Sequence, residues 1–179
     1  DETVLSETGD LDHVILEKDL PRNAGLPCVI GIGEGRVRKS VVKRYKNVVE
    51  FVNLIHPSAT FGRGQREVVE NSEGVIVAAG ARFTCNIAIG DHCIINQNAT
   101  IAHDCIIESY SHVGPGANVS GNVFIGSQCW IGAGAVINQG TPGQMLKIGN
   151  ATQIGSGSVV IKSCLKHSVY AGVPARKLP

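Results

Sequence analysis

Residues 77–137 read VAAGARFTCNIAIGDHCIINQNATIAHDCIIESYSHVGPGANVSGNVFIGSQCWIGAGAVI and carry a six-residue repeat without a gap. An apolar residue occupies every sixth position, and the register resumes after a short interruption. A fixed short period indicates that each repeat is one structural unit, which buries its apolar face only by stacking on its neighbours. The residues on this register are Val77, Phe83, Ile89, Ile95, Ile101, Ile107, Val113, Val119, Ile125, Ile131 and Ile137, then Ile148, Ile154 and Val160.

The repeat is typical of very short strands joined by sharp corners. A small residue usually stands two positions before the apolar one, so both side chains point to the inner side of a strand. Glycine or asparagine often follows, and both tolerate the positive φ that a sharp corner can demand. Three repeats make a triangular coil of about 18 residues. We therefore expect a mainly β protein, a parallel β-helix of about four to five coils; a β-sandwich would show irregular spacing instead.

Composition excludes several classes of function. The 179 residues carry a formal net charge of +1 and only 4% aromatic residues, so we expect no nucleic-acid partner. No apolar run is long enough to insert into a membrane. The six cysteines lack metal-binding spacings, and Cys93, Cys105 and Cys129 fall at the small inner position of the repeat. We expect buried packing thiols, no metal and a cytoplasmic location.

The repeat is absent from residues 1–55, where the pattern changes to that of a βαβ unit. Residues 27–33 predict a buried strand ending in a glycine turn, residues 36–49 a helix with a basic outer face, and residues 49–55 a second strand. This order is the start of a Rossmann-like nucleotide-binding domain. We therefore expect a small α/β domain at residues 1–55 and the β-helix with its C-terminal cap at residues 56–179.

Two segments outside the regular repeat are candidates for binding. The turn at residues 31–35, which contains Gly33, is either a plain turn or a cradle for a diphosphate on backbone N–H groups. Arg38 lies on the predicted basic face of the helix, which is either solvated or a functional patch. Residues 138–147 interrupt the repeat and predict a loop that protrudes from a corner.

Histidines next to polar residues are the candidate chemistry. His103, near a corner and beside Asp104, can act as a base if the corner brings the two side chains together. One coil further on, the 18-residue period places Gly121 over His103 and Trp130 over His112, and a glycine N–H there can stabilise an oxyanion. The histidines for which we expect a solvated surface position are His13, His92 and His167.

Several segments together resemble a known family. They are the hexads, FVNLIHPSA at residues 51–59, AHDC at 102–105, SHV at 111–113 and the closing GVPA at 172–175. The chain resembles the left-handed β-helix hexapeptide-repeat acyltransferases, in the branch of sialic-acid O-acetyltransferases and UDP-4-amino-sugar N-acetyltransferases. The resemblance implies left-handed coils, a homotrimer with active sites between neighbouring helices, acetyl-CoA as acyl donor and a nucleotide-linked amino sugar held by the N-terminal domain.

The same resemblance implies roles for individual residues. His103 matches the general base, Asp104 its supporting carboxylate and Gly121 the backbone donor to the thioester oxygen. His112 and Asn96 match a second polar pair in the site. The residues expected along the acetyl-CoA groove are Gly132, Ala133, Gly155, Ser156, Val173 and Pro174.

The expected reaction is acetyl transfer from acetyl-CoA to the 4-amino group of a UDP-linked 4-amino-4,6-dideoxy sugar. One alternative is O-acetylation of sialic acid or another sugar hydroxyl, which needs the same base. A second is a non-catalytic or γ-carbonic-anhydrase-like β-helix. The family usually opens with a strand and a Gly-rich, His-containing turn that this sequence lacks, so we expect a truncated N-terminal domain.

Overall fold

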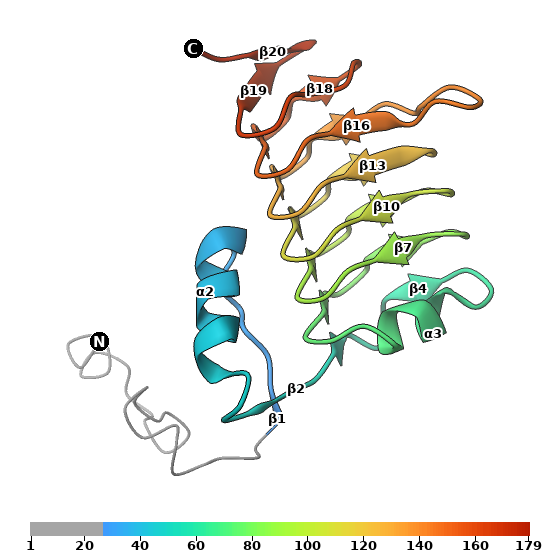
Figure 1. The fold of residues 1–179 in the computed structure, drawn as a ribbon. Helices are drawn as coiled ribbons and strands as arrows, with labels where there is room; N and C mark the ends of the chain where they lie inside the picture. The colour runs from blue at the N-terminus through green and yellow to red at the C-terminus, as the bar shows by residue number, and fades with distance from the viewer. Residues whose placement is uncertain (1–26) are drawn as a thin grey trace, which may run out of the picture.

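Three β-sheets, parallel except for one antiparallel pair at the C-terminal end, wrap around one axis and form the body of the protein (Figure 1). The computed structural model describes residues 27–179. The chain forms a left-handed β-solenoid of about six turns, with a small α/β region on its N-terminal side. The predicted fold class is thereby confirmed. His13 and the first 26 residues of the predicted N-terminal domain lie outside the described residues.

Each side of the solenoid is one sheet of very short strands. The first side consists of β3 (Leu54–Ile55), β5 (Ile76–Val77), β8 (Ile94–Ile95), β11 (His112–Val113), β14 (Trp130–Ile131), β17 (Gln153–Ile154), β19 (Val169–Gly172) and β20 (Ala175–Lys177). The second side consists of β4 (Thr60–Phe61), β6 (Arg82–Phe83), β9 (Thr100–Ile101), β12 (Asn118–Val119), β15 (Val136–Ile137) and β18 (Val159–Val160). The third side consists of β7 (Ala88–Ile89), β10 (Ile106–Ile107), β13 (Val123–Ile125) and β16 (Leu146–Ile148).

The repeat sets the register between coils. Within it, residues 18 positions apart lie side by side, as where Val113 pairs with Ile131 on the first side. The apolar residue of each hexad points inward and is buried, and the small residue two positions earlier, such as Cys93 or Ala99, is buried beside it. Each coil therefore carries its outward-facing side chains at the same three sides and corners as the coil below.

The solenoid has more coils than the hexads predict. The extra coil precedes the repeat: β3 pairs with β5 and β4 with β6, so both extend the sheets at their lower end. In this coil the helix α3 (Gln65–Glu70) takes the place of a strand on the third side and packs against β7. Because a helix replaces one side, the six-residue step from Ile55 to Phe61 does not continue to Val77, which is why the sequence predicted too few coils.

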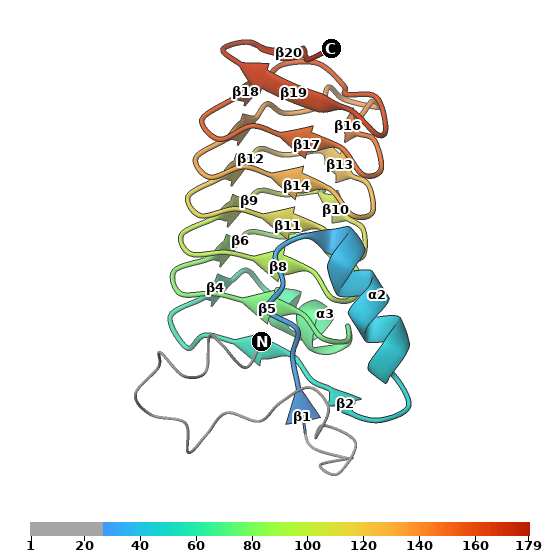
Figure 2. The same ribbon diagram turned by 90° about the vertical axis from the view of Figure 1, so that its left-hand side faces the viewer.

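Within residues 27–55, the α/β region is less regular than predicted. Only β1 (Pro27–Cys28) is a strand in the predicted segment 27–33, and it pairs in parallel with β2 (Glu50–Phe51). The predicted strand at residues 49–55 is in fact divided, because Leu54 and Ile55 turn into the first side of the solenoid. The helix α2 (Gly35–Tyr45) lies along that side, beside β8 and β11 (Figure 2).

Candidate active site

His103 and Asp104 form a hydrogen-bonded pair at the corner between β9 and β10. Neighbouring strand residues point to opposite faces, but Asp104 has a φ of +58°, and this left-handed corner turns its side chain back toward the ring. The distance from His103 Nδ1 to Asp104 Oδ2 is 2.7 Å. The predicted corner conformation is therefore present, and both side chains stay open to solvent.

The carboxylate of Asp104 is held in its charged form. Asn86, one coil below, donates its side-chain amide to Oδ1, and the ring of His103 contacts Oδ2. The amide of Asn86 first, and His103 second, lower the pKa of Asp104. Since a carboxylate only accepts, the proton between the two side chains belongs to Nδ1, and Nε2 of His103 is left as the basic nitrogen.

Gly121 lies directly over the ring of His103. A Cβ at Gly121 would come within 2.6 Å of both Cε1 and Nε2, so any side chain there would displace the ring. Within residues 27–179, no hydrogen-bond partner is found for the backbone N–H of Gly121. A cavity of about 480 Å³ opens here, bounded by His103, Gly121 and residues 139–143 of the protruding loop.

His112 and Asn96 form the second predicted pair, on the first side of the solenoid. Asn96 Nδ2 lies 3.2 Å from Nε2 of His112, and Nδ1 of His112 lies 3.2 Å from the carbonyl oxygen of Gly33. The ring also meets Trp130 edge-on, with 4.4 Å between centroids. Burial under these groups lowers the pKa of His112, and the charge of nearby Arg38 lowers it further, while the hydrogen bond with Gly33 opposes both effects.

The two histidine sites lie apart within one chain. His103 belongs to the corner between the second and third sides, whereas His112 faces outward from β11 on the first side. The predicted acetyl-CoA residues Gly132, Ala133, Gly155 and Ser156 lie at a further corner, between the first and second sides, where Gly132 stacks closely on residues 154–156. Val173 and Pro174 form the exposed tip of the β19–β20 hairpin.

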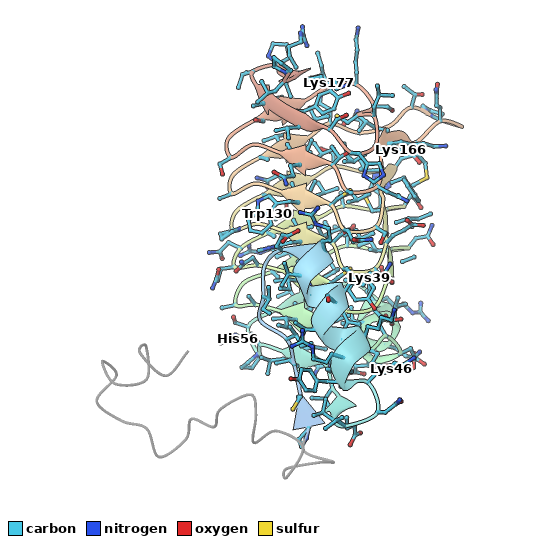
Figure 3. The ribbon with its side chains drawn as sticks, turned by 60° about the vertical axis from the view of Figure 1, so that its left-hand side comes forward. Lys39, Lys46, His56, Trp130, Lys166 and Lys177 are labelled. Carbon is cyan, nitrogen blue, oxygen red and sulfur yellow. The ribbon has the colours of Figure 1, made fainter. Side chains whose placement is uncertain are left out.

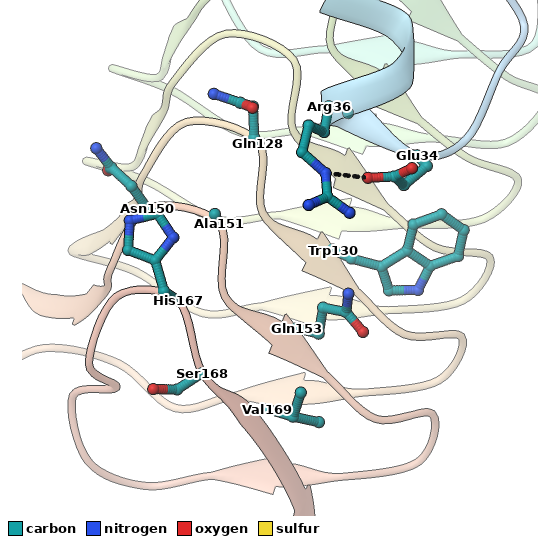
Figure 4. Close-up of a pocket in the computed structure, with 11 residues that line it drawn as sticks. Glu34, Arg36, Gln128, Trp130, Asn150, Ala151, Gln153, His167, Ser168 and Val169 are labelled. Atoms are coloured by element: carbon teal, nitrogen blue, oxygen red, sulfur yellow. Dashed lines mark hydrogen bonds and ion pairs between the residues drawn. The ribbon is translucent and has the colours of Figure 1, made fainter.

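A second cavity of about 500 Å³ lies beside Trp130. Figure 3 shows Trp130 near the start of α2, and Figure 4 shows the cavity. The wall of this cavity contains one aromatic ring, several side-chain amides and an ion pair, in which Arg36 Nε lies 3.1 Å from Glu34 Oε1. Sequence reasoning missed most of this wall, because its residues come from irregular corners of different coils. The lining side chains are those of Glu34, Arg36, Gln128, Trp130, Asn150, Ala151, Gln153, His167, Ser168 and Val169.

The expectation that Arg38 belongs to a basic outer face is wrong. Its side chain is completely buried between α2 and the solenoid. The guanidinium donates to backbone carbonyl oxygens of Ile32, Gly33, His92, Tyr110 and Ser111. Because these bonds occupy its three nitrogens, Arg38 has no donor left for a substrate phosphate.

His92 is likewise buried, not solvated as expected. Its ring stacks on Tyr110 at 5.3 Å between centroids and meets Phe51 edge-on at 5.0 Å. Nδ1 has no hydrogen-bond partner among the described groups. Burial lowers the pKa of His92, although the nearby carboxylate of Glu73 opposes this shift. His92 is buried because of tertiary packing: Phe51 of β2 covers the corner that carries His92, which the repeat alone would leave exposed.

In the part of the chain that the structure describes, no group of three or more His, Cys, Asp or Glu side chains is placed to hold a metal ion. Among those same residues, no helix has the length and apolar character needed to cross a membrane.

The left-handed solenoid of hexads, which carries a His–Asp pair at one corner, matches a family of bacterial transferases. Residues 86–121 match the family model described as bacterial transferase hexapeptide (six repeats). WeeI from Acinetobacter baumannii AYE shares 30% sequence identity and superposes with a TM-score of 0.86, covering 97% of this chain and 82% of its own. The chain belongs to the hexapeptide-repeat left-handed β-helix acetyltransferases.

Two of the similar proteins are named for, or were crystallised with, a nucleotide-linked amino sugar. The structure of PerB from Caulobacter crescentus in complex with CoA and GDP-perosamine has 29% identity and a TM-score of 0.80, covering 91% of this chain and 76% of PerB. GDP-perosamine N-acetyltransferase of Escherichia coli O157:H7 is 32% identical over 121 residues, which are 67% of this chain and 53% of that protein. The chain thus spans about half the length of the curated relatives it matches.

Proposed function

We propose that this protein transfers an acetyl group from acetyl-CoA to the amino group of a nucleotide-linked sugar. The proposed acceptor is the 4-amino group of a UDP-linked 4-amino-4,6-dideoxy sugar. The observation that carries the proposal is the corner where His103 is oriented by Asp104 and covered by Gly121. The likeness to proteins named as perosamine N-acetyltransferases supports an amine as acceptor over a hydroxyl.

The corner supplies each group that this reaction needs. Nε2 of His103 accepts the proton that the amine loses as its nitrogen attacks the thioester carbonyl. The backbone N–H of Gly121 stabilises the negative charge that develops on the thioester oxygen. The carbon–sulfur bond then breaks and CoA leaves as a thiolate, which takes up a proton. Neither a covalent enzyme intermediate nor a metal ion is required.

We propose further that the complete site forms between neighbouring chains of a homotrimer. His103 and His112 lie on different sides of the solenoid, so a ligand that meets both needs a second chain. The third side supports this arrangement, because its outer surface presents the apolar side chains of Ala88, Ile106 and Phe124 one above another. Ile106 is 38% exposed in the single chain, as expected for a surface that another copy covers.

A subunit-mixing experiment tests this arrangement. His103→Ala and His112→Ala proteins should each be impaired, while trimers randomly reassembled from equal amounts should recover about one quarter of the intact sites. Recovery arises because one interface in four then joins an intact His103 to an intact His112. No recovery above the two inactive parents, or a monomer by light scattering, would contradict a shared site.

The acceptor is tested by a panel with a common readout. Release of the CoA thiol is measured with UDP-linked and GDP-linked 4-amino-4,6-dideoxy sugars, CMP-sialate and free sialate. We expect turnover with the UDP-linked amine. Preference for the GDP-linked sugar would keep N-acetylation and change the nucleotide, whereas turnover only with a sialate would replace it by O-acetylation.

A further inference from the structure

Arg38 and His112 share no direct hydrogen bond, but both side chains contact the same backbone group. The link between them is the carbonyl oxygen of Gly33, which lies 2.9 Å from Nη1 of Arg38 and 3.2 Å from Nδ1 of His112. We infer that Arg38 is a positioning residue, which holds the Gly33 carbonyl against His112 and thereby keeps the imidazole in the neutral Nδ1–H tautomer. This inference rests on the proposed function, in which the bound acceptor meets both His103 and His112.

The tautomer follows from the partners of the two ring nitrogens. A carbonyl oxygen only accepts, so Nδ1 of His112 must carry the proton in its bond to Gly33. At the other nitrogen the partner is the amide of Asn96, whose orientation is set because its Oδ1 accepts from the backbone N–H of Gln97 at 2.9 Å. Asn96 therefore presents its NH₂ group to Nε2, which must be the unprotonated nitrogen.

Arg38 is placed to hold the carbonyl of Gly33 firmly. Its side chain is fully buried, and it donates hydrogen bonds to the carbonyl oxygens of Ile32 and Gly33, which precede α2. Its other bonds reach the solenoid, from Nε to His92 at 2.7 Å and from Nη2 to Tyr110 at 2.6 Å. The guanidinium thus ties residues 32–33 to the corner beside β11, and such charge-assisted bonds are stronger than neutral ones.

The charge of Arg38 favours the neutral form of His112, whereas the His112–Gly33 bond that Arg38 holds in place selects which nitrogen carries the proton and opposes the lowering of the pKa. Burial is the largest cause that lowers the pKa of the His112 imidazole, and the fixed positive charge of Arg38 lowers it further. Both keep the Nε2 lone pair available at physiological pH. The bond from Asn96 to Nε2 is long at 3.2 Å, so an acceptor amine can replace it as the donor. His112 would then orient the amine through Nε2 while His103 of the neighbouring chain removes its proton.

Nuclear magnetic resonance of the protein with ¹⁵N-labelled histidine tests the inference without any substrate. Long-range ¹H–¹⁵N correlation separates the two neutral tautomers and the charged ring. His112 of the native protein should show the Nδ1–H pattern from about pH 6.5 to pH 8. An Nε2–H pattern, or a charged ring, would overturn the inference at once, whether or not any variant folds.

Variants then assign the effect to Arg38. In Arg38→Met, which removes the charge and all donors, the His112 signals should move toward the Nε2–H and charged forms, and in Arg38→Lys they should move part of the way. Arg82→Met is the matched control, because this exposed arginine also donates to a carbonyl, that of Gly80. Unchanged His112 signals in a folded Arg38→Met, or in Arg38→Lys if the first variant fails to fold, would overturn the inference.

Kinetics give a second and separable readout. Arg38→Lys should raise KM for the amino-sugar acceptor about tenfold and leave KM for acetyl-CoA unchanged. A loss of stability alone would lower the active fraction and change neither KM. If the protein transfers no acetyl group, the proposed function is wrong, and the His112 spectra still decide the role of Arg38. If transfer is measured but the His112 spectra of the Arg38 variants do not change, only the proposed role of Arg38 is wrong.

Discussion

Replacing Gly121 by alanine should disable His103 while leaving the fold intact. The added Cβ would lie 2.6 Å from Cε1 and Nε2 of the ring, whereas ordinary contact begins at 3.4 Å, so the ring must retreat by about 0.8 Å. Displacing a catalytic group by about 1 Å costs about 10²-fold in rate, which is about 2.7 kcal/mol of transition-state stabilisation. We therefore expect kcat to fall about 10²-fold.

The fold should tolerate this change for two reasons. Gly121 is not among the residues with a positive φ, so alanine can adopt its backbone conformation. The atoms that the Cβ meets belong to a side chain that is 59% exposed, and the ring can swing into solvent at little cost. The free energy of unfolding, measured with urea, should change by less than about 0.5 kcal/mol.

A double-mutant cycle separates this mechanism from a general defect. His103→Ala alone should lower kcat by about 10²–10⁴-fold and leave the assembly unchanged. With that ring absent, Gly121→Ala should cost little more, since its Cβ has nothing left to displace. The assay is release of the CoA thiol at saturating acetyl-CoA and acceptor. Full activity of Gly121→Ala, or an equal loss with and without His103, would refute the reasoning.

Three further outcomes are expected. Asp104→Asn should lower kcat about 10²-fold in the same assay, because the charge that holds the Nδ1 proton of His103 is lost, with urea unfolding unchanged as control. Burial lowers the pKa of His92 and His112, so below about pH 6.5 the unfolded chain binds more protons than the folded chain. The free energy of unfolding in urea should therefore fall as the pH drops from about 6.5 to about 5.5, and it should stay level above about pH 7.5. The variant His92→Phe should show a weaker dependence on pH. A thiol reagent should label exposed Cys85 in the native protein and not Cys93, whose pKa burial raises to about 12.

The regular repeat made part of the site predictable at the level of single residues. A period of 18 residues places Gly121 over His103 and Trp130 over His112, and the structure confirms both stackings. The same period connects Asn86 with Asp104, a contact that counting back one coil from the carboxylate would have found. Such contacts are predictable because in a solenoid a residue's neighbour above is set by sequence distance alone.

The contacts of Arg38 and His92 were not predictable in this way. Arg38 reaches Tyr110, 72 residues away, and His92 is covered by Phe51 from β2. Both depend on how the α/β region packs against the outer surface of the first side, which no period in the sequence encodes. A basic residue on an amphipathic helix and a histidine at a polar corner therefore looked solvated, although burial decides the chemistry of both.

The division between regular and irregular parts also divides the proposed reaction. The proposed base His103, its partner Asp104 and Gly121 lie on two consecutive coils. The register between these coils fixes their geometry, which does not depend on the acceptor. His112 depends instead on Gly33, and through it on Arg38 and the α/β region. In this arrangement the solenoid supplies the acetyl-transfer chemistry, and the packing of one short segment onto its first side determines how the acceptor amine is received.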